Sequence, residues 1–134
     1  MKLLLLLSTI LTCFAQEKTI GNKAIQSISL VEVLDNQIDE AIYYFEHNWK
    51  VYRDVALKRG VIKSYALYKT IEATGTVYLL LITEYQDQDQ YDSREENFKQ
   101  IIDAERPDGP KLLNQKKAEE FRKTVKSYIM QSAF

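Results

Sequence analysis

The pattern of apolar and polar positions predicts a strand followed by a long helix in the first half of the chain. Residues 27–33 alternate, with Ile28 and Leu30 on one face, as in a strand. Asn36 and Asp39 have the spacing of a capping box, and Gly60 stands where a helix would end. Between them, six apolar residues at steps of four and three share one stripe of a helix: Ile38, Ile42, Phe45, Trp49, Tyr52 and Ala56.

Two further strands are predicted in the middle of the chain. Residues 61–69 are rich in aromatic and β-branched side chains, and a turn at 72–75 leads into residues 76–85. The second of these segments contains an unbroken apolar and aromatic run at 77–82. Such a run predicts a strand that is buried on both faces and therefore central in its sheet.

The last third of the chain predicts two more helices and a final strand. Ser93 and Glu96 form a second capping-box pattern ahead of an amphipathic helix that carries Phe98, Ile101 and Ile102. The prolines in 106–110 must stop this helix. A further helix with a weak apolar face is expected over 111–123, and a strand over 124–134.

The order of these elements is β-α-β-β-α-(α)-β, which predicts one α+β domain over residues 27–134. Two βαβ-type halves of this kind form the ferredoxin-like fold, with an antiparallel four-stranded sheet in the order 4-1-3-2 and helices on one face. The third strand, which the apolar run marks as doubly buried, is central in that order.

The predicted fold leaves one face of the sheet without helices. If Val77, Leu79 and Leu81 pack beneath the helices, the side chains of Tyr78, Leu80, Ile82 and Glu84 point the other way. Monomers rarely expose an apolar patch of this size. We therefore expect two copies to pack face to face around a two-fold axis, as a homodimer.

Three segments carry a family resemblance: Phe45 with Trp49 and Lys50, the stretch 60–68, and the stretch 81–85. In these positions the chain resembles the dimeric α/β-barrel superfamily, which includes small stress-induced barrel proteins, antibiotic-biosynthesis monooxygenases and haem-degrading monooxygenases. The resemblance covers residues 27–102 and implies a ferredoxin-like fold in a face-to-face dimeric barrel. It implies no single activity, because this fold hosts many chemistries. The helix expected at 111–123 departs from the simplest members.

The N-terminal segment has the layout of a cleaved export signal. A lysine precedes an apolar run, and the small residues at positions 13 and 15 suit cleavage after Ala15. We expect residues 1–15 to be removed, residues 16–26 to form a polar tether, and the protein to be periplasmic or secreted. The alternative is a membrane-attached lipoprotein held through Cys13, the only cysteine of the chain.

Composition narrows the possible partners and cofactors. The 134 residues are 46% hydrophobic, the formal net charge is −1, and basic residues are scattered among acidic ones. We therefore expect no nucleic-acid partner, and a membrane partner only if Cys13 is lipidated. No phosphate loop, nucleophile elbow or metal-ligand spacing occurs, so no cofactor and no metal are expected.

The only histidine, His47, is predicted to face away from the sheet. Haem-degrading relatives use an Asn, a Trp and a His from separate elements, whereas Asn48 and Trp49 here adjoin His47 on one helix and cannot converge with it. Tyr43, His47 and Val51 share the outer face of that helix. This face is either exposed or partly covered by the helix expected at 111–123.

Two carboxylates are the candidate catalytic groups, Glu32 and Glu84. Each follows apolar residues on a face of its own strand. If the two central strands pair in a suitable register, these acids would sit at the rim of the cavity between the two sheets. A carboxylate desolvated there would have a raised pKa and could act as a general acid or base. The alternative is that both are solvated at strand ends. Candidate ligand contacts are Tyr65, Tyr68, Tyr78, Leu80 and Ile82, for which core or dimer packing is the other interpretation.

The leading functional hypothesis is an exported homodimer whose cavity between the sheets binds a small apolar molecule, such as an aromatic one. The first alternative is a cofactor-free monooxygenase or isomerase with Glu32 or Glu84 as its base. The second is a structural or interaction module with a filled cavity. The sequence leaves open whether the protein is an enzyme.

Overall fold

The computed structural model describes residues 23–71 and 75–134. The predicted signal segment, with Cys13, lies outside the described residues. So do residues 16–22 of the predicted tether and residues 72–74 of the predicted turn. Among the helices that the structure describes, none is long and apolar enough to cross a membrane.

The described chain forms strands and helices in the predicted order, with short helices added between them. The strands are β1 (Ile25–Val33), β2 (Ser64–Lys69), β3 (Tyr78–Tyr85) and β4 (Arg122–Gln131). After the 3-10 turn η1 (Leu34–Asn36) comes a long helix made of α1 (Ile38–Tyr44), the π-helical turn η2 (Phe45–Trp49) and α2 (Lys50–Lys58). The helices after β3 are α3 (Gln88–Asp92), α4 (Arg94–Glu105) and α5 (Ala118–Phe121).

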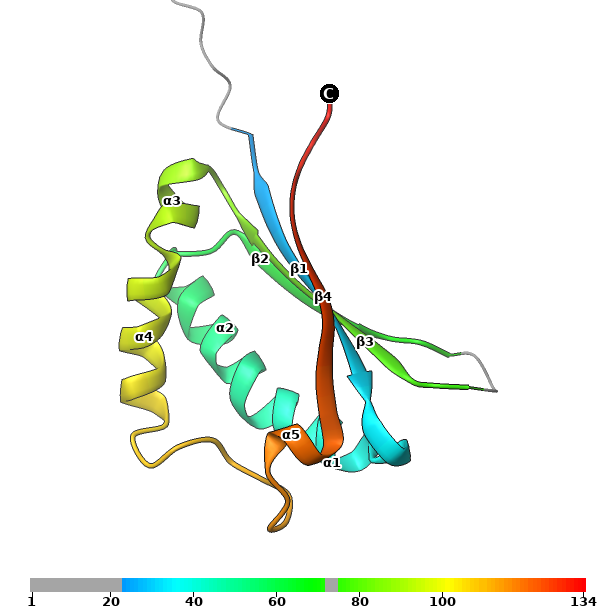
Figure 1. Ribbon diagram of the computed structural model, residues 1–134. Helices are drawn as coiled ribbons and strands as arrows, with labels where there is room; N and C mark the ends of the chain where they lie inside the picture. The colour runs from blue at the N-terminus through cyan, green and yellow to red at the C-terminus, as the bar shows by residue number, and fades with distance from the viewer. Residues whose placement is uncertain (1–22, 72–74) are drawn as a thin grey trace, which may run out of the picture.

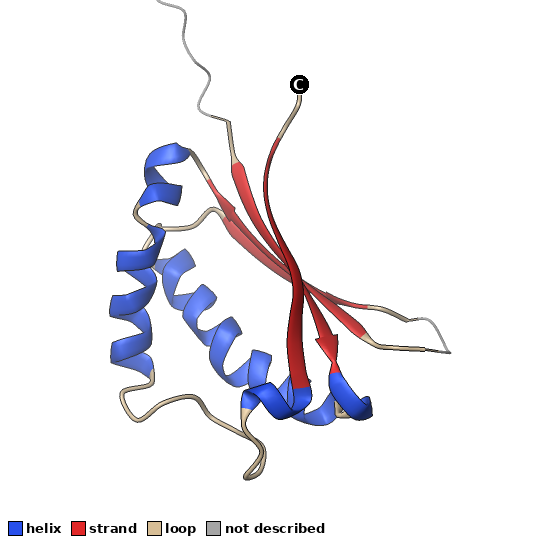
Figure 2. Ribbon diagram, in the orientation of Figure 1, coloured by secondary structure: helices blue, strands red, loops and turns tan. Residues whose placement is uncertain are grey.

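The strands form one antiparallel sheet in the order β2-β3-β1-β4. The long helix and α4 lie on the same side of this sheet (Figures 1 and 2). The chain is therefore of the α+β class, as predicted. The predicted interior position of β3 is also confirmed. We call the side of the sheet that faces away from the helices the open face.

Side chains of β3 alternate between the two sides of the sheet. Leu79, Leu81, Thr83 and Tyr85 are buried on the helix side, whereas every second residue from Tyr78 onward is only partly buried. The predicted assignment of the two faces is thus confirmed. The strand was predicted to be buried on both faces. In a single chain, only the face toward the helices is buried.

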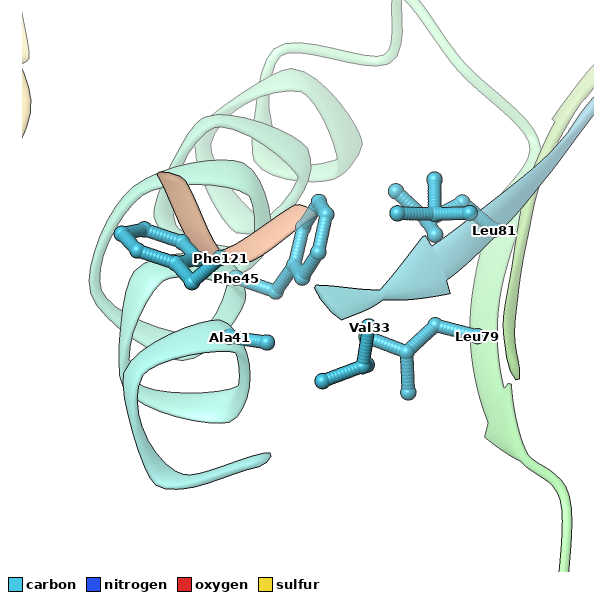
Figure 3. Packing of buried hydrophobic residues seen from close by; sticks show 7 residues of the cluster. Val33, Ala41, Phe45, Leu79, Leu81 and Phe121 are labelled. Carbon is cyan, nitrogen blue, oxygen red and sulfur yellow. The ribbon is translucent and has the colours of Figure 1, made fainter. Parts of the chain in front are cut away.

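Two clusters of buried side chains form the core on the helix side. In the first, Val33 and two leucines of β3 meet Ala41, Phe45 and Phe121 (Figure 3). The second lies toward the other end of the long helix and contains Tyr52, Ala56, Ile62, Tyr85 and Ile101. Each large side chain buried in this way contributes about 1.5–3 kcal/mol to stability.

The predicted apolar stripe of the long helix faces these clusters. Phe45, Tyr52 and Ala56 are buried, and the other three stripe residues pack partly buried against the core. The stripe also includes two residues that the prediction did not contain, Ala41 and Asn48, which are 0% and 1% exposed.

The predicted end of the long helix at Gly60 is confirmed. Gly60 has a φ of 69°, in the left-handed region that glycine tolerates. Its N–H donates to the Leu57 carbonyl (3.1 Å), and the Val61 N–H donates to the Ala56 carbonyl (3.0 Å). These two bonds form a Schellman motif, which satisfies the last carbonyls of the helix.

The predicted capping box at the start of the long helix is wrong. The residue before the helix is Gln37, and it makes no side-chain capping bond. Asp35 and Asn36 instead take left-handed backbone angles, with φ of 48° and 55°, which short polar side chains tolerate. The Gln37 amide Nε2 donates to the carbonyl of Glu120 (2.8 Å) and so joins this turn to α5.

The second predicted capping box, Ser93 with Glu96, is also wrong. The polar stretch before Ser93 forms α3, whose cap is Asp87: its carboxylate accepts a bond from the Gln90 N–H at 2.8 Å. Ser93 Oγ donates back to the carbonyl of Asp89 (3.0 Å). Its hydroxyl is therefore committed to α3 and makes no cap for α4.

The helix predicted over 111–123 is wrong in length. Only the four residues of α5 are helical, and β4 begins at Arg122 rather than Thr124. Long-range polar contacts hold the preceding segment instead, because Asn114 Nδ2 and Lys116 Nζ both donate to Glu40 Oε1 at 3.1 Å. Leu112 packs against the first core cluster. The long helix that was one of the two alternatives for covering Tyr43, His47 and Val51 is therefore not formed.

Candidate functional site

A cleft opens between the long helix and the sheet, where β1 pairs with β4. It encloses about 290 Å³, near the lower end of the roughly 300–1,000 Å³ that is usual for small-ligand sites. The long helix contributes four aromatic side chains to its wall, from Tyr44, Phe45, Trp49 and Tyr52. We call this hollow the helix-side cleft.

The π-helical turn η2 lies at the wall of the helix-side cleft. His47 Nδ1 lies 2.9 Å from the Tyr43 carbonyl oxygen, which only accepts, so this nitrogen carries the proton. Asn48 Nδ2 donates in the same way to the Tyr44 carbonyl (2.8 Å). Both side chains thus hold carbonyls of the preceding turn. Such wide turns occur often at functional sites.

Asn48 joins the long helix to the segment that follows α4. Its Oδ1 accepts from the Lys111 N–H (2.7 Å) and from Arg106 Nε (3.3 Å), and its Nδ2 also donates to the Lys111 carbonyl (2.8 Å). Arg106 donates in addition to the carbonyl of His47. Because its amide is fully engaged in these bonds, Asn48 acts as a structural clamp at the cleft.

Two arginines line the cleft, Arg53 from α2 and Arg122 from the start of β4. The guanidinium of Arg53 lies 4.8 Å from the ring centre of Trp49 and 4.1 Å from that of Phe98, and its Nε donates to Thr83 Oγ1 (3.2 Å). Burial lowers the pKa of Arg53 to about 10, so it still carries its charge at neutral pH. The cleft is therefore both aromatic and positively charged.

Tyr52 lines the same cleft with a neutral phenol. Burial raises the pKa of this phenol. Tyr52 is thus protonated and uncharged at neutral pH.

Tyr65 does not lie with the other predicted ligand contacts. It pairs with Thr83 in the sheet, and its ring packs edge to face on Trp49 with centroids 5.5 Å apart. Its hydroxyl donates to the Asp54 carboxylate, and burial followed by this bond raises its pKa. Tyr65 therefore faces the helices, and its predicted place in a cavity between two sheets is wrong.

The other predicted ligand contacts gather on the open face. In the β-sheet register, Leu80 pairs with Tyr68 on one side and Leu30 on the other, while Ile82 pairs with Ile28. Tyr68 is 60% exposed, and Tyr128 and Met130 of β4 are 44% and 50% exposed. Tyr78 stands at the end of the same face.

The two candidate catalytic carboxylates do not meet. Glu32 pairs with Tyr78 and Glu84 pairs with Gln26, so the two carboxylates stand at opposite ends of the antiparallel β1–β3 pair. At about 3.4 Å per residue, their positions along the sheet differ by roughly 20 Å. The two carboxylates therefore lie in separate surroundings, at opposite ends of the described sheet.

Glu84 is also held as an ion. Lys63 Nζ lies 2.6 Å from its Oε1, and Gln26 Nε2 donates to its Oε2 (2.8 Å). The hydrogen bond from Lys63, followed by that from Gln26, lowers the pKa of Glu84. In the single chain this is the opposite of the raised pKa expected for a general acid at neutral pH.

The three adjacent residues His47, Asn48 and Trp49 point to different surroundings, as predicted. The His47 ring stacks on Tyr43 with centroids 3.8 Å apart, Asn48 binds the segment after α4, and Trp49 packs on Tyr65. Asn48 and Trp49 both line the helix-side cleft, but His47 does not, so the three form no common site. Among the described residues, no group of His, Cys, Asp and Glu side chains is placed to hold a metal ion.

Sequence reasoning missed three residues of the cleft: Asn48, Arg53 and Arg122. The first two had a detectable pattern. Asn48 lies three residues after Phe45 and four before Tyr52, so it is a polar residue inside an apolar stripe. Arg53 follows Trp49 by one turn. Arg122 could not be found in this way, because its neighbours in the cleft come from distant parts of the chain.

Comparison with known proteins adds little to this geometry. No protein family matches the chain in a comparison with family sequence profiles, and no curated protein matches it. One similar solved structure is that of a conserved protein from Methanosarcina mazei Go1, with 17% sequence identity and a TM-score of 0.43. The alignment covers 82% of this chain and 91% of that protein. The resemblance to the dimeric α/β-barrel superfamily therefore stays a prediction.

Proposed function

We propose that the protein is a homodimer in which each chain binds a small, largely apolar molecule with an aromatic ring in its helix-side cleft. The observation that carries this proposal is the wall of four aromatic side chains around a hollow of about 290 Å³. Aromatic rings favour offset or edge-to-face contact with another ring, and a few polar groups would fix its orientation. The proposed site differs from the one expected between two sheets, because the charged and aromatic groups converge on the helix side.

The proposed fold is ferredoxin-like, and the proposed dimer joins two open faces. The strand order β2-β3-β1-β4 supports the fold, since from the other edge it reads 4-1-3-2. The paired apolar residues of the open face support the dimer: Ile28, Leu30, Leu80 and Ile82 adjoin one another at its centre. Burying them against a second copy would remove this apolar surface from water.

The geometry does not favour Glu84 as the base of a carboxylate-based enzyme. Glu32 and Glu84 stand at opposite ends of the sheet, and Glu84 is ion-paired with Lys63. Export remains part of the proposal on the N-terminal sequence pattern alone, with attachment through Cys13 as its alternative.

Fluorescence of Trp49 tests the binding proposal directly, because Trp49 is the only tryptophan of the chain and lines the cleft. Titration with the uncharged aromatic dye phenylnaphthylamine should change Trp49 emission and saturate at one dye per chain. The variant Thr124→Phe places a ring in the cleft wall and should abolish this saturable change.

The matched control is Lys123→Phe, because Lys123 pairs with Glu32 and lies on the other side of β4 from Thr124. This variant should bind the dye as the wild type does. Wild-type protein that binds no dye, or a Thr124→Phe variant that binds it normally, would contradict a ligand site in the cleft. A filled cleft with no ligand would then favour the interaction module.

A further inference from the structure

The positive charges of the helix-side cleft have no acidic partner in the described chain. The ion pairs among residues 23–71 and 75–134 join other lysines and arginines to carboxylates, and neither Arg53 nor Arg122 takes part in one. A buried or half-buried charge without a counter-charge carries a desolvation cost. Two such charges in one cleft therefore make the cleft suited to an anion.

Arg122 has hydrogen-bonding capacity left over. Its guanidinium lies 4.7 Å from the ring centre of Tyr44 and 5.6 Å from that of Phe45. Its Nη2 donates to the Tyr44 hydroxyl at 3.3 Å, a long bond, whereas its buried Nε has no partner among the described residues. A guanidinium presents five N–H donors in a planar fork that matches a carboxylate or sulfonate.

The aromatic neighbours place this charge beside the proposed ring site. Tyr44 and Phe45, over which the Arg122 guanidinium lies, are also part of the cleft wall. Arg53 lies in the same cleft, with its guanidinium beside Trp49. An acid group attached to a ring bound in the cleft would thus lie near both arginines.

We propose that the ligand is an aromatic acid whose ring occupies the helix-side cleft and whose anionic group accepts hydrogen bonds from the guanidinium of Arg122, with Arg53 adding positive potential. This inference rests on the proposed function and specifies its ligand class. It assigns Arg122 as a binding residue that selects charged over neutral ligands.

A matched pair of dyes tests the charge requirement. Anilinonaphthalene sulfonate carries the same rings as phenylnaphthylamine and adds one sulfonate. The wild-type protein should bind the sulfonate at least about tenfold more tightly than the neutral dye, because hydrogen bonds to charged groups are the strong ones. Added sodium chloride should weaken binding of the sulfonate and leave the neutral dye unchanged.

The variant Arg122→Gln should lose this preference while it keeps its affinity for the neutral dye. Arg122→Lys, which retains a positive charge without the fork, should keep part of the preference. The matched control is Arg59→Gln, which removes the same charge from an exposed residue just after α2. It should leave both affinities unchanged.

Equal affinity of the wild type for both dyes would overturn the inference, and so would a sulfonate preference that survives in Arg122→Gln. These results differ from failure of the proposed function, in which neither dye binds in the cleft. If Arg122→Gln does not fold, as judged by circular dichroism, the salt dependence of the wild type and the Arg122→Lys affinities decide the question.

Discussion

The two sides of β3 carry side chains of similar character in very different surroundings. Leu79 is completely buried beneath the long helix, whereas its neighbour Leu80 is only partly buried on the open face. The helix side also holds the buried amide of Asn48 in internal bonds, whereas the open face holds Glu84 in an ion pair with Lys63. Strand β3 thus has apolar side chains on both faces, as a strand covered on both sides would. The helices of one chain cover only one of these faces.

The largest expected effect is a difference in the free energy of unfolding between variants of Leu79 and Leu80. Leu79→Ala removes a fully buried side chain and should lower the free energy of unfolding by about 3 kcal/mol. Leu80→Ala should cost less than about 1 kcal/mol in dilute protein, where single chains dominate. Urea denaturation at two protein concentrations measures both, and in a homodimer only the Leu80→Ala cost should grow with concentration. Equal costs in dilute protein would remove the contrast between the faces.

A second, smaller effect concerns the buried amide of the helix side. Asn48→Ala leaves the backbone N–H and C=O of Lys111 without their partners. Its cost should be about 2 kcal/mol by urea denaturation, because Asn48 is buried and each of the several hydrogen bonds it loses contributes roughly 0.5–1.5 kcal/mol. Asn114→Ala is the control: it removes two exposed bonds, one to Glu40 and one from the Lys116 N–H, and should cost less than about 1 kcal/mol. A neutral Asn48→Ala would mean that the segment after α4 is held by other contacts.

The smallest effect is the pH dependence contributed by Glu84 on the open face. Lys63, and then Gln26, lowers the pKa of Glu84 in the folded chain. A carboxyl group with a lowered folded pKa stabilises the fold above its unfolded pKa, and this stability is lost as pH falls through the folded pKa. The stability difference between wild type and Glu84→Gln should therefore shrink from about pH 6 to pH 3, from a value below about 1 kcal/mol.

The control for this pH series is Glu46→Gln, which replaces an exposed glutamate of the long helix that forms no ion pair in the described chain. The pH dependence of the Glu84→Gln difference is read relative to this control. A Glu84→Gln difference that grows toward acid would contradict the ion pair with Lys63.

The sequence predicted the features that depend on periodicity within one element. The apolar run of β3 and the stripe of the long helix are repeated patterns, and Gly60 is a strong local marker of a helix end. Both predicted capping boxes were wrong, because a pattern of two residues does not show which other groups compete for the same hydrogen bonds. Ser93, for example, donates to a carbonyl of α3, and α3 was not predicted from the polar sequence before Ser93.

The candidate site was harder to predict because it depends on register and on distant contacts. The pairing of β1 with β3 decides that Glu32 and Glu84 lie apart, and the pairing of β2 decides that Tyr65 faces the helices. A one-residue change of register would move each side chain to the other face. The helix-side cleft combines residues from β1, the long helix and β4, so no pattern within a single segment predicts it.

Sedimentation velocity of the wild type and of Leu80→Asp tests most directly whether a second copy covers the open face. The wild type should sediment as a dimer at micromolar concentration, and Leu80→Asp as a folded monomer with an unchanged circular dichroism spectrum. Ile71→Asp, a charge added at a residue that is 92% exposed, should leave the dimer intact. A wild-type protein that remains a monomer at every concentration, or a Leu80→Asp variant that remains a dimer, would contradict the account.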